Sequence, residues 1–516
     1  MNVFDILNRA NRYHTTQKAV IYSACTSKDF DGVGSIDYQH LYYFASIFSS
    51  QLNKLGVVKG DRIAVFLPNV VEYPIVTYGA LRIGAVPVLI SIAQKKEKVR
   101  DFVLASGAKI LVTSESLAAE AQLAAEITHL IMVEENHPYT KVGKLRSSYP
   151  LVAADCEPHD PAFILYTSGT TTGEQKGAVL SHGNVVSNVY ATNHHTGMTS
   201  QDVGVCFLPL FHCFGQNFVM NSIFNAGATM VLHRRFELME VLESIRKNRV
   251  SIFYSIPPNY RMLHKLPDFE AEYLRPIRYF FTAADTMPVE VAQNWRQRFG
   301  KIIHEGWGLT ETSPFATYNH DYHYRDGSVG TPIENVEVRI VGEDGVFCQA
   351  GDIGEIAVRG PNVFSGYYND PEATASAIRH GWFYTGDIGY LDEDGYLFVV
   401  DRKNDRLKVH GFSVWPREIE KCLRAYFGAR LNDIGVIGVP DEARGQMPYA
   451  FAVKGDAALS EEEIIQACKE KLGGYQLLKG VKFVDCIPKT PTGKILKHEL
   501  RKLTDLPPDT AKEENK

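Results

Sequence analysis

The sequence has few of the features that mark secreted, disulfide-bonded or membrane-spanning proteins. Its eight cysteines are scattered among 516 residues, with no Cys-x-x-Cys pair and no spacing typical of a disulfide framework. This favours reduced thiols in a cytoplasmic protein. No run of about 18 apolar residues is present, and the first residues lack the charged-then-apolar order of a signal peptide. We therefore expect neither secretion nor a transmembrane segment, and contact with a membrane surface stays open.

A nucleic-acid partner is also disfavoured. The formal net charge is -6, and no run of lysine and arginine is long enough to form a basic face. Internal repeats and long low-complexity tracts are absent from the sequence. What is present is length: 516 residues, 45% of them hydrophobic, exceed what one core comfortably organises, so we expect at least two domains. The oligomeric state stays open.

The pattern of apolar residues predicts an α/β fold. Buried-strand runs such as 62–67 and 108–113 alternate with helical stretches such as 78–83 and 117–127. This alternation favours layers of helices and parallel strands. From about residue 329 to 360 the pattern changes to short strands separated by Gly/Asp turns, which is typical of a small β subdomain.

A polar segment then marks a domain boundary. Six consecutive hydrophilic residues, 401–406, interrupt the apolar pattern. The residues that follow predict a compact α+β domain, with helices over 416–423 and 460–472 and a strand over 434–439. The predicted divisions are a large domain over 1–400, a hinge over 401–404, a small domain over 405–506 and a frayed polar tail over 507–516.

The most informative stretch is YTSGTTTGEQKG, residues 166–177. It follows the apolar end of a predicted buried strand and combines hydroxyl groups, glycines and Lys176. Glycines let backbone N–H groups converge on anionic oxygens, so this composition is typical of a loop that holds phosphate. The stretch is not a Walker A loop, because Lys176 is followed by Gly177 rather than by Ser or Thr. By itself it could equally be a solvated turn.

Five further segments accompany this loop in a fixed order along the chain. They are LPLFHCFG (208–215), GWGLTETSP (306–314), WFYTGDIGYLDEDGYL (382–397), DRKNDRLKVHGFSVWPREIE (401–420) and PKTPTGKILK (488–497). Together they resemble the adenylate-forming family, which contains acyl-CoA synthetases, non-ribosomal peptide adenylation domains and firefly luciferases. The resemblance covers essentially the whole chain. It implies an N-terminal AMP-binding adenylation domain and a small C-terminal domain that is mobile.

The resemblance implies that a carboxylate attacks the α-phosphate of ATP, releases pyrophosphate and forms acyl-AMP. Because two anions must meet, cations and hydrogen-bond donors have to be fixed beside the reacting oxygens. Thr310 is implied to reach the α-phosphate and Glu311 to hold Mg²⁺. Without the other motifs, Glu311 could be a carboxylate at the start of a helix. The implied ligands of the β and γ phosphates are Thr167, Ser168, Gly169, Thr170, Thr171 and Lys176.

Other residues are implied to hold the nucleoside and the acid. Asp387 resembles the aspartate that accepts hydrogen bonds from both ribose hydroxyls, although it could instead be an aspartate of a turn. Arg402 is implied to make a second contact with the ribose. Trp307 stands where the family usually has tyrosine and offers adenine a stacking face. Lys494 resembles the lysine that bridges carboxylate and α-phosphate, and its flanking proline and glycine favour a rigid turn. An isolated lysine is otherwise a solvated surface residue.

The second half-reaction is implied to use Gly411. In the family the small domain rotates after adenylation, withdraws the lysine and presents the HGF segment to the channel where pantetheine enters. A glycine lets the backbone approach the pantetheine closely. The hinge is expected at Lys403 or Asn404. Relatives commonly carry Asp or Lys at the pivot, so Asn404 is a departure.

Two other departures lie near the nucleotide. The phosphate loop carries an extra Thr172, and Gln175 replaces the usual proline, so its hydroxyl assignments could shift by one residue. The segment TAADTMP (282–288) occupies the place of a Gly-Gly-Ala-Pro-Leu type segment. Asp285 within it could touch the adenine or the acid, or it could cap a helix.

His212 bears on which acid is activated. It stands where amino-acid-adenylating relatives have an aspartate for the α-amino group, so a simple carboxylic acid is favoured. Because the VWPREIE segment most resembles fatty acyl ligases, we predict a medium-to-long-chain acyl-CoA ligase. The apolar residues near His212 suggest a substrate pocket, or else plain core: Phe211, Phe214, Phe218 and Met220.

Other functions stay open. The acceptor could be the phosphopantetheine of a carrier protein, although no insertion of the kind that blocks CoA use lies between residues 330 and 401. A non-catalytic acyl- or nucleotide-binding protein is disfavoured by the joint presence of Lys494, Glu311 and Asp387. The fold also permits luciferase chemistry, for which nothing in the sequence selects. The expected cofactors are ATP, Mg²⁺ and either CoA or carrier-protein phosphopantetheine.

Overall fold

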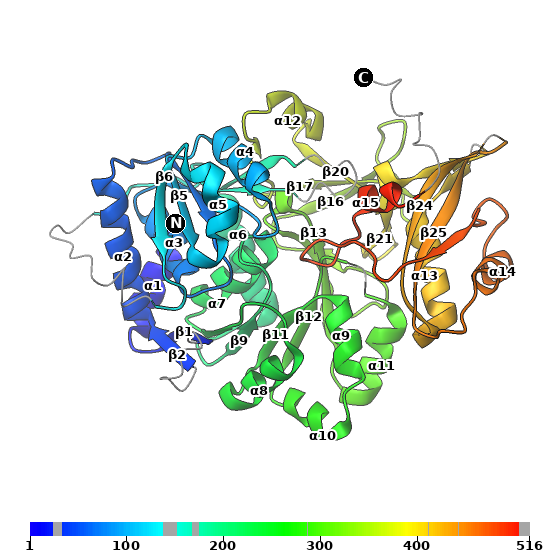
Figure 1. Ribbon diagram of the computed structural model, residues 1–516, viewed down its shortest axis with the longest axis horizontal. Coiled ribbons are helices and arrows are strands. Elements are labelled where there is room, and N and C mark those ends of the chain that lie inside the picture. Colours follow the sequence, from blue (N-terminus) through cyan, green and yellow to red (C-terminus); the bar gives the residue numbers. More distant parts are fainter. Residues whose placement is uncertain are drawn as a thin grey trace.

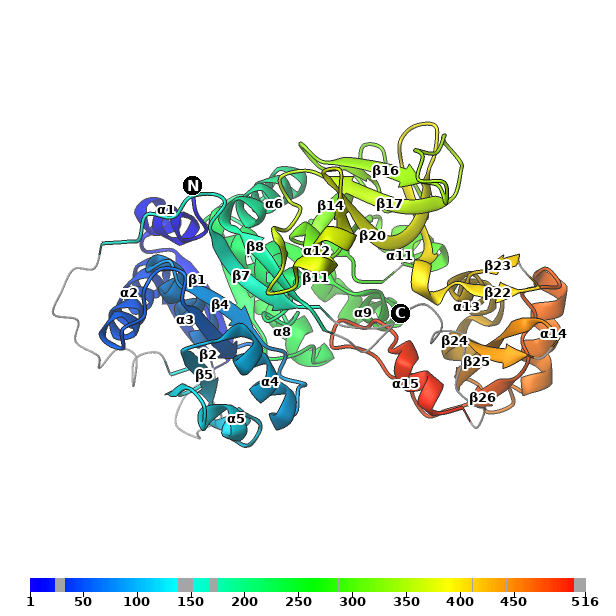
Figure 2. The same cartoon turned by 90° about the horizontal axis from the view of Figure 1, so that it is seen from above.

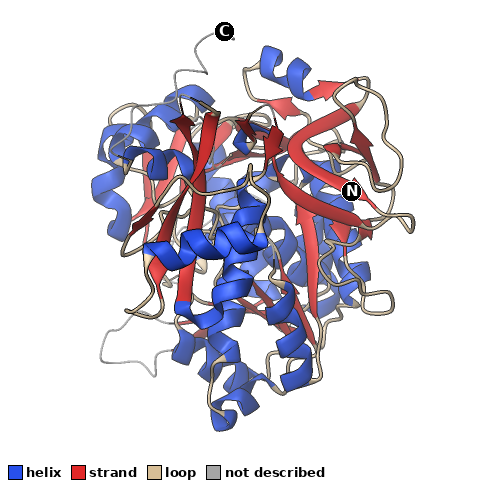
Figure 3. Cartoon of the chain, turned by 90° about the vertical axis from the view of Figure 1, so that its right-hand side faces the viewer, coloured by secondary structure: helices blue, strands red, loops and turns tan. Residues whose placement is uncertain are grey.

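The computed structural model describes residues 1–23, 33–137, 152–167, 175–285, 287–410, 412–441 and 443–504. Two large sheets with their helices form the left and centre of Figure 1, and a small domain lies at the right. Seen from the side, strands form the inner layers and helices pack over them (Figure 3). The α/β class predicted from the sequence is confirmed.

The first large sheet positions most of the site. Its strand order is β15-β14-β13-β12-β11-β9-β10-β1-β2. The strands from β13 to β1 run parallel, and antiparallel strands close both edges. Apolar runs such as YFFT in β12 are what a strand covered on both faces requires. The bounds are β1 (Lys18–Ser23), β2 (Val33–Asp37), β9 (Val203–Cys206), β10 (Thr229–Leu232), β11 (Ile252–Ser255), β12 (Tyr279–Thr282), β13 (Ile303–Gly308), β14 (Phe315–Tyr318) and β15 (Thr331–Pro332).

The second large sheet carries the ends of the phosphate loop. Its order is β18-β8-β7-β4-β3-β5-β6, with parallel strands from β7 to β6. Strands β7 and β8 are antiparallel, and Tyr166 pairs with Gly177, so the two ends of the loop lie side by side. The bounds are β3 (Arg62–Phe66), β4 (Val86–Leu89), β5 (Ile110–Ser114), β6 (His129–Val133), β7 (Pro161–Tyr166), β8 (Gly177–Ser181) and β18 (Gly366–Tyr367).

Helices cover these sheets, and their starts follow capping chemistry. Ser181 and Asn184 form a reciprocal capping box at α6, and Asp37 accepts a hydrogen bond from His40 N at α2. The α-helices are α1 (Phe4–His14), α2 (Tyr38–Lys54), α3 (Glu72–Arg82), α4 (Lys96–Ser106), α5 (Ala118–Ala125), α6 (His182–Thr196), α7 (Ser222–Asn225), α8 (Leu238–Asn248), α9 (Pro257–His264), α10 (Asp268–Ala271), α11 (Val289–Phe299) and α12 (Pro371–Ala377). Shorter turns are η1 (Glu115–Leu117), the π-helix η2 (Phe214–Asn221), η3 (Glu272–Leu274) and η4 (Thr310–Thr312).

The β subdomain is larger than the sequence predicts. Its antiparallel sheet has the order β16-β17-β20-β19, with β21 beside β20, and it reaches Arg402 rather than ending near Gly360. The difference arises because the TGD motif lies inside the long strand β20 and not in a turn. The bounds are β16 (Glu337–Val341), β17 (Gly354–Arg359), β19 (Ile378–Arg379), β20 (Trp382–Leu391) and β21 (Leu397–Arg402).

The C-terminal domain has its own sheet and cores. After η5 (Lys403–Asp405), its sheet has the order β23-β22-β25-β24 with β26 beside β25. Its hydrophobic clusters contain only residues from 407 onward, whereas the main cluster ends at 397. This separation supports the proposed division at 401–404. The bounds are β22 (Leu407–Val409), β23 (Phe412–Val414), α13 (Pro416–Phe427), η6 (Gly428–Arg430), β24 (Leu431–Asp441), β25 (Gly445–Lys454), α14 (Glu461–Lys471), β26 (Val481–Phe483) and α15 (Lys497–Lys502).

The cysteines and the helices of the described ranges bear on two expectations from the sequence, reduced thiols and no transmembrane segment. Within them, every cysteine is a free thiol. No helix in the same ranges has the length and the apolar composition needed to cross a bilayer.

Candidate functional site

The segment that carries Lys494 is a tight turn, as the sequence predicts. The carbonyl of Thr490 accepts a hydrogen bond from Gly493 N (2.8 Å), and the side-chain Oγ1 of Thr490 accepts one from Lys494 N (3.1 Å). Gly493 has φ of +88°, where a side chain would be strained. A methyl group placed on Gly493 would lie 3.2 Å from Ile256 Cδ1 at the start of α9. This lysine loop (residues 489–495) therefore rests against the N-terminal domain, as both Figure 1 and Figure 2 show for the red chain.

Asp387, Arg402 and Trp307 meet at one point. Asp387 and Arg402 face each other across β20 and β21, and Arg402 Nε lies 2.7 Å from Asp387 Oδ1. On β13, Trp307 Nε1 donates a hydrogen bond of 2.9 Å to Asp387 Oδ2. Asp387 is buried, and its carboxylate is held between the Arg402 guanidinium at Oδ1 and the Trp307 indole at Oδ2. The alternative of a turn aspartate is wrong, because Asp387 lies inside a strand.

Lys494 lies in the electrostatic field of these residues. Burial lowers the pKa of Lys494, the positive charge of Arg402 lowers it further, and the negative charge of Asp387 opposes both. Burial also lowers the pKa of His212 to about 3, with help from the charge of Lys494. The structure thus brings together four predicted site residues that lie far apart in the sequence.

Glu311 and Lys176 both contact Tyr367. Tyr367 Oη donates a hydrogen bond of 2.9 Å to Glu311 Oε1, and Lys176 Nζ lies 5.5 Å from the centre of the Tyr367 ring. Thr167 N donates to the carbonyl of Lys176 (2.9 Å), and Lys176 N donates to Thr167 Oγ1 (3.1 Å). Thr310 and Glu311 begin the short turn η4, so the helix-start alternative correctly describes the local structure of Glu311. Tyr367 joins the phosphate loop to this carboxylate.

Two asparagines hold the chain after Glu311 in place. Asn188 Nδ2 donates to the carbonyl of Phe315 (2.8 Å), and Asn362 Nδ2 donates to the carbonyls of Thr312 (3.1 Å) and Phe315 (2.8 Å). Both asparagines are buried. Sequence reasoning misses them, as it misses Tyr367, because their partners lie in distant segments.

His212 directly precedes Cys213, the residue that contacts Thr310. Phe214 N donates to His212 Nδ1 (3.2 Å), so a neutral His212 carries its hydrogen on Nε2. The neighbouring Cys213 Sγ lies 3.7 Å from Thr310 Oγ1. Burial raises the pKa of the Cys213 thiol to about 12, which makes it a poor nucleophile. The imidazole N–H of His212 therefore belongs to the residue next to the Cys213–Thr310 contact.

Asp285 joins the two domains. Arg417 Nη2 donates to Asp285 Oδ1 (2.5 Å), and Arg417 N donates to Asp401 Oδ2 (2.9 Å). The Asp285 and Arg417 side chains are 23% and 31% exposed, so the ion pair is partly shielded from solvent. The helix-capping alternative for Asp285 is wrong, because the N-cap of α11 is Pro288, with no side-chain cap.

Part of the predicted site lies outside the described residues. These positions are Ser168, Gly169, Thr170 and Thr171 of the phosphate loop, the additional Thr172, and Gly411.

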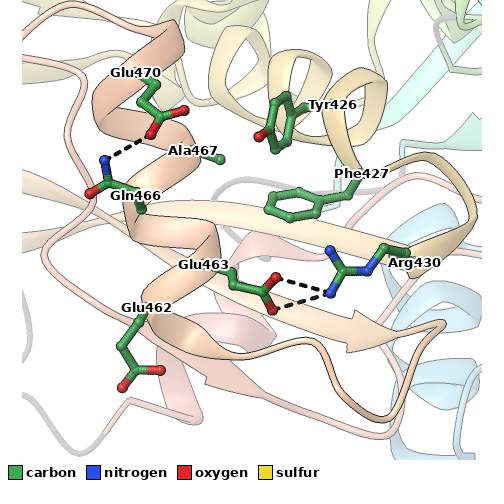
Figure 4. A pocket seen from close by; sticks show the side chains of 8 residues that line it. All are labelled: Tyr426, Phe427, Arg430, Glu462, Glu463, Gln466, Ala467 and Glu470. Carbon is green, nitrogen blue, oxygen red and sulfur yellow. Dashed lines mark hydrogen bonds and ion pairs between the residues drawn. The ribbon is translucent and has the colours of Figure 1, made fainter.

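Two cavities elsewhere in the described chain contain none of the predicted site residues. One, of about 330 Å³, lies between α13 and α14, where Tyr426 and Phe427 face an acidic helix (Figure 4). The other, of about 300 Å³, is lined by histidines and tyrosines near the end of α6 and the start of β12. Neither adjoins the lysine loop.

Comparison with known proteins agrees with this arrangement. The AMP-binding enzyme family matches residues 7–368, and the AMP-binding enzyme C-terminal domain matches residues 418–494. The chain belongs to the AMP-binding enzymes. The family resemblance inferred from the motifs is therefore confirmed.

Relatives within the AMP-binding enzymes span most of the chain. A long-chain-fatty-acid–CoA ligase from Escherichia coli O157:H7 is 31% identical over 487 residues, which cover 87% of this chain and 86% of the relative. A 4-coumarate–CoA ligase 2 from Oryza sativa subsp. japonica is 34% identical over 487 residues, covering 88% and 85%. Among solved structures, ATP-bound MatB from Rhodopseudomonas palustris is 28% identical with a TM-score of 0.88 over 98% of this chain and 99% of that chain. Apo MatB gives a TM-score of 0.76, so this AMP-binding enzyme matches the ATP-bound form more closely.

Proposed function

We propose that this AMP-binding enzyme is an acid–thiol ligase that activates a carboxylic acid as acyl-AMP and transfers it to CoA. The observation that carries the proposal is the position of the lysine loop, which rests against the N-terminal domain at Ile256 and sets Lys494 in the field of Asp387 and Arg402. Relatives that share the chain's fold or sequence include CoA ligases for long-chain fatty acids, 4-coumarate, o-succinylbenzoate and anthranilate. Their common reaction supports CoA as the acceptor, whereas their acids differ.

The residues present fit ATP and Mg²⁺. The Asp387 carboxylate has two acceptor oxygens, which suits ribose hydroxyls, and the Trp307 ring adjoins this carboxylate and can stack on adenine. Glu311 offers a single carboxylate, which suits an ion that binds one or two carboxylates together with substrate phosphates and water. Thr167 and Lys176 hold the two ends of the phosphate loop. Mg²⁺, when bound, would neutralise the developing charge on the phosphate oxygens.

In the first step, Lys494 and Thr310 would act on the reacting oxygens. Two unit charges about 4 Å apart repel by about 4 kcal/mol at an effective dielectric constant of about 20, so the carboxylate and the α-phosphate need a cation between them. The Lys494 ammonium donates hydrogen bonds to both groups, and the Thr310 hydroxyl donates to the α-phosphate. His212 Nε2–H adds a neutral donor near the acid. The burial that lowers the pKa of Lys494 also strengthens these interactions.

In the second step, the C-terminal domain would rotate about Lys403 or Asn404, withdraw Lys494 and bring Gly411 to the thiol. This rotation has to separate Arg417 from Asp285, because the two residues lie in different domains. A pair that is partly exposed holds the docked arrangement without locking it.

The finer parts of the proposal concern the acid and the acceptor. A medium-to-long-chain fatty acid and a cytoplasmic location stay predictions from the sequence, and a carrier-protein acceptor stays the alternative. The test is ATP-dependent thioester formation over a panel of aliphatic, aromatic and dicarboxylic acids, with CoA and a phosphopantetheinylated carrier protein in parallel. Thioester with CoA supports the proposal. Pyrophosphate release followed by transfer to the carrier protein alone would replace CoA as the acceptor, and no pyrophosphate release with any acid would refute the ligase.

Adenylation activity is expected to be lost on the alkaline side at a lower pH than it would be if Lys494 had the pKa of a solvent-exposed lysine. The charged ammonium is the active form, and burial lowers the pKa of Lys494. The kcat/KM for pyrophosphate release should therefore fall as pH rises through this lowered pKa, since kcat/KM reports the free enzyme. Lys494→Arg is the matched variant, because a guanidinium stays charged and should move the alkaline limb of its residual activity to higher pH. An unchanged limb in the arginine variant would assign the titration to another group.

Arg417→Met is expected to slow adenylation by about fivefold, because a partly exposed ion pair contributes about 1 kcal/mol to docking of the lysine loop. Asp285→Asn should have a similar effect, and the double variant should lose little more than either single variant. Arg430→Met is the control, since Arg430 pairs within the C-terminal domain with Asp456 and Glu463. Single-turnover rates of acyl-AMP formation measure the effect. Fully additive losses would mean that the two residues do not act as a pair.

A further inference from the structure

Four phenylalanine rings fill the space behind His212. This aromatic block consists of Phe214, Phe218, Phe281 and Phe315, and each residue is at most 4% exposed. Ring centres are 4.2 Å apart for Phe218 and Phe315, 4.5 Å for Phe218 and Phe281, and 5.2 Å for Phe281 and Phe315. Phe214 lies 5.5 Å from Phe218. The rings are in mutual contact, so the block is packed rather than hollow.

The block is built from elements that start at the site. Phe214 and Phe218 belong to the π-helix η2, which begins two residues after His212. A π-helix is rare and is frequent at functional sites. Phe281 lies on β12 and Phe315 on β14, on either side of β13. Two of the apolar residues that suggested a substrate pocket in the sequence, Phe214 and Phe218, therefore fill that space themselves.

The block also covers the backbone of β13. A methyl group placed on Gly306 would lie 2.8 Å from Phe281 Cζ and 2.9 Å from Phe315 Cδ1, both closer than carbon atoms approach. The strand surface beside Trp307 consequently has no room for even one methylene group. Tyr254 backs the block, 5.2 Å from Phe218 between ring centres, so Phe218 has no free space to turn into.

The binding position of the substrate carboxylate determines how the aromatic block limits the acyl group. The acid has to place its carboxylate at Lys494 and Thr310, and Cys213 contacts Thr310 directly. Because Phe214 follows Cys213 in the chain, an acyl group that extends from the carboxylate toward the sheet meets the block at once.

We infer that the aromatic block restricts the acid to a compact aliphatic carboxylate, in the range from acetate to butyrate, and that Phe218 is the residue that sets this limit. The inference rests on the proposed ligase function and names the acid for it. It opposes the medium-to-long chain predicted from the sequence. Phe218 is the residue to vary because its ring makes the two closest contacts of the block, at 4.2 Å and 4.5 Å, and because it lies on the π-helix that begins two residues after His212.

The test compares acetate, butyrate, octanoate and dodecanoate as substrates of the wild type and of Phe218→Ala. Wild type should use butyrate with at least about tenfold higher kcat/KM than octanoate, measured as pyrophosphate release and as acyl-CoA formed. Phe218→Ala opens a cavity in the block and should reverse this order, mainly through a lower KM for octanoate. Phe218→Leu, a milder change, should shift the preference in the same direction if the alanine variant does not fold.

Phe253→Ala is the matched control. Phe253 is equally buried, but its ring contacts Phe207, Tyr260 and Phe280 instead of the block. The acid preference of the Phe253→Ala variant should therefore stay that of the wild type. A wild type that uses octanoate or dodecanoate better than butyrate would overturn the inference and leave the ligase intact. A wild type that releases no pyrophosphate with any acid would refute the ligase itself. An alanine or leucine variant with unchanged preference would remove Phe218 from the acid site.

Discussion

Lys494→Ala is expected to slow acyl-AMP formation by about 10²- to 10³-fold or more, while transfer of supplied acyl-AMP to CoA stays within a few-fold of wild type. Removing one preorganised donor from a developing negative charge costs about this much. In the proposed reaction the lost group is also the cation between two anions, and its burial would increase its effect. The second half-reaction is spared because the lysine loop would by then have left the site.

The measurement is single-turnover pyrophosphate release for the first step and acyl-CoA formation from synthetic acyl-AMP for the second. Lys489→Ala is the control, because Lys489 lies on the same loop but pairs with Asp433 inside the C-terminal domain, at 2.5 Å. It should leave both steps near wild type. Equal losses in both steps for Lys494→Ala would show that the lysine is needed for folding or for docking rather than for adenylation.

Asp387→Asn is expected to raise the KM for ATP by about 100-fold, with a much smaller effect on the KM for the acid. Hydrogen bonds to a charged group contribute about 1.5 to 3 kcal/mol each, and the carboxamide that replaces the carboxylate keeps only one acceptor oxygen. The substitution also leaves the guanidinium of Arg402, 2.7 Å from Asp387 Oδ1, without its counter-charge.

Deoxynucleotides separate a ribose contact from a general disturbance. Wild type should discriminate against 2′-deoxy-ATP and 3′-deoxy-ATP, and Asp387→Asn should lose most of this discrimination because the acceptor is already impaired. Trp307→Phe is the companion variant: it keeps an aromatic face and removes the 2.9 Å hydrogen bond to Asp387, so it should weaken ATP binding less. Discrimination that is the same in wild type and Asp387→Asn would place the ribose elsewhere.

Local sequence predicts the regular elements well where periodicity is strong. The helices predicted over 416–423 and 460–472 correspond to α13 and α14, and the strand predicted over 434–439 lies within β24. The β subdomain is predicted too short, because the contacts that assign β20 to its sheet come from β17 and β21 rather than from the TGD motif. Pairing between strands is a long-range property, and a local window contains no trace of it.

Local spacing also predicts the chemistry of single residues. The proline and glycine beside Lys494 predict a rigid turn because each restricts or permits backbone angles within its own peptide unit. The same reasoning leaves Asp285 undecided between a cap and a ligand. Its partner Arg417 lies 132 residues away and in the other domain, so only the folded chain shows an ion pair.

The sequence by itself determined which groups this protein can bring to a reaction: a glycine- and hydroxyl-rich loop with Lys176, the acidic Glu311 and Asp387, and Lys494 on a turn. Only the tertiary structure decided what surrounds them. Tyr367 reaches Glu311 across 56 residues, and the four rings behind His212 come from η2, β12 and β14. The physical reason is that chemical identity and backbone preference are local, whereas burial and packing depend on which distant segments share the same space.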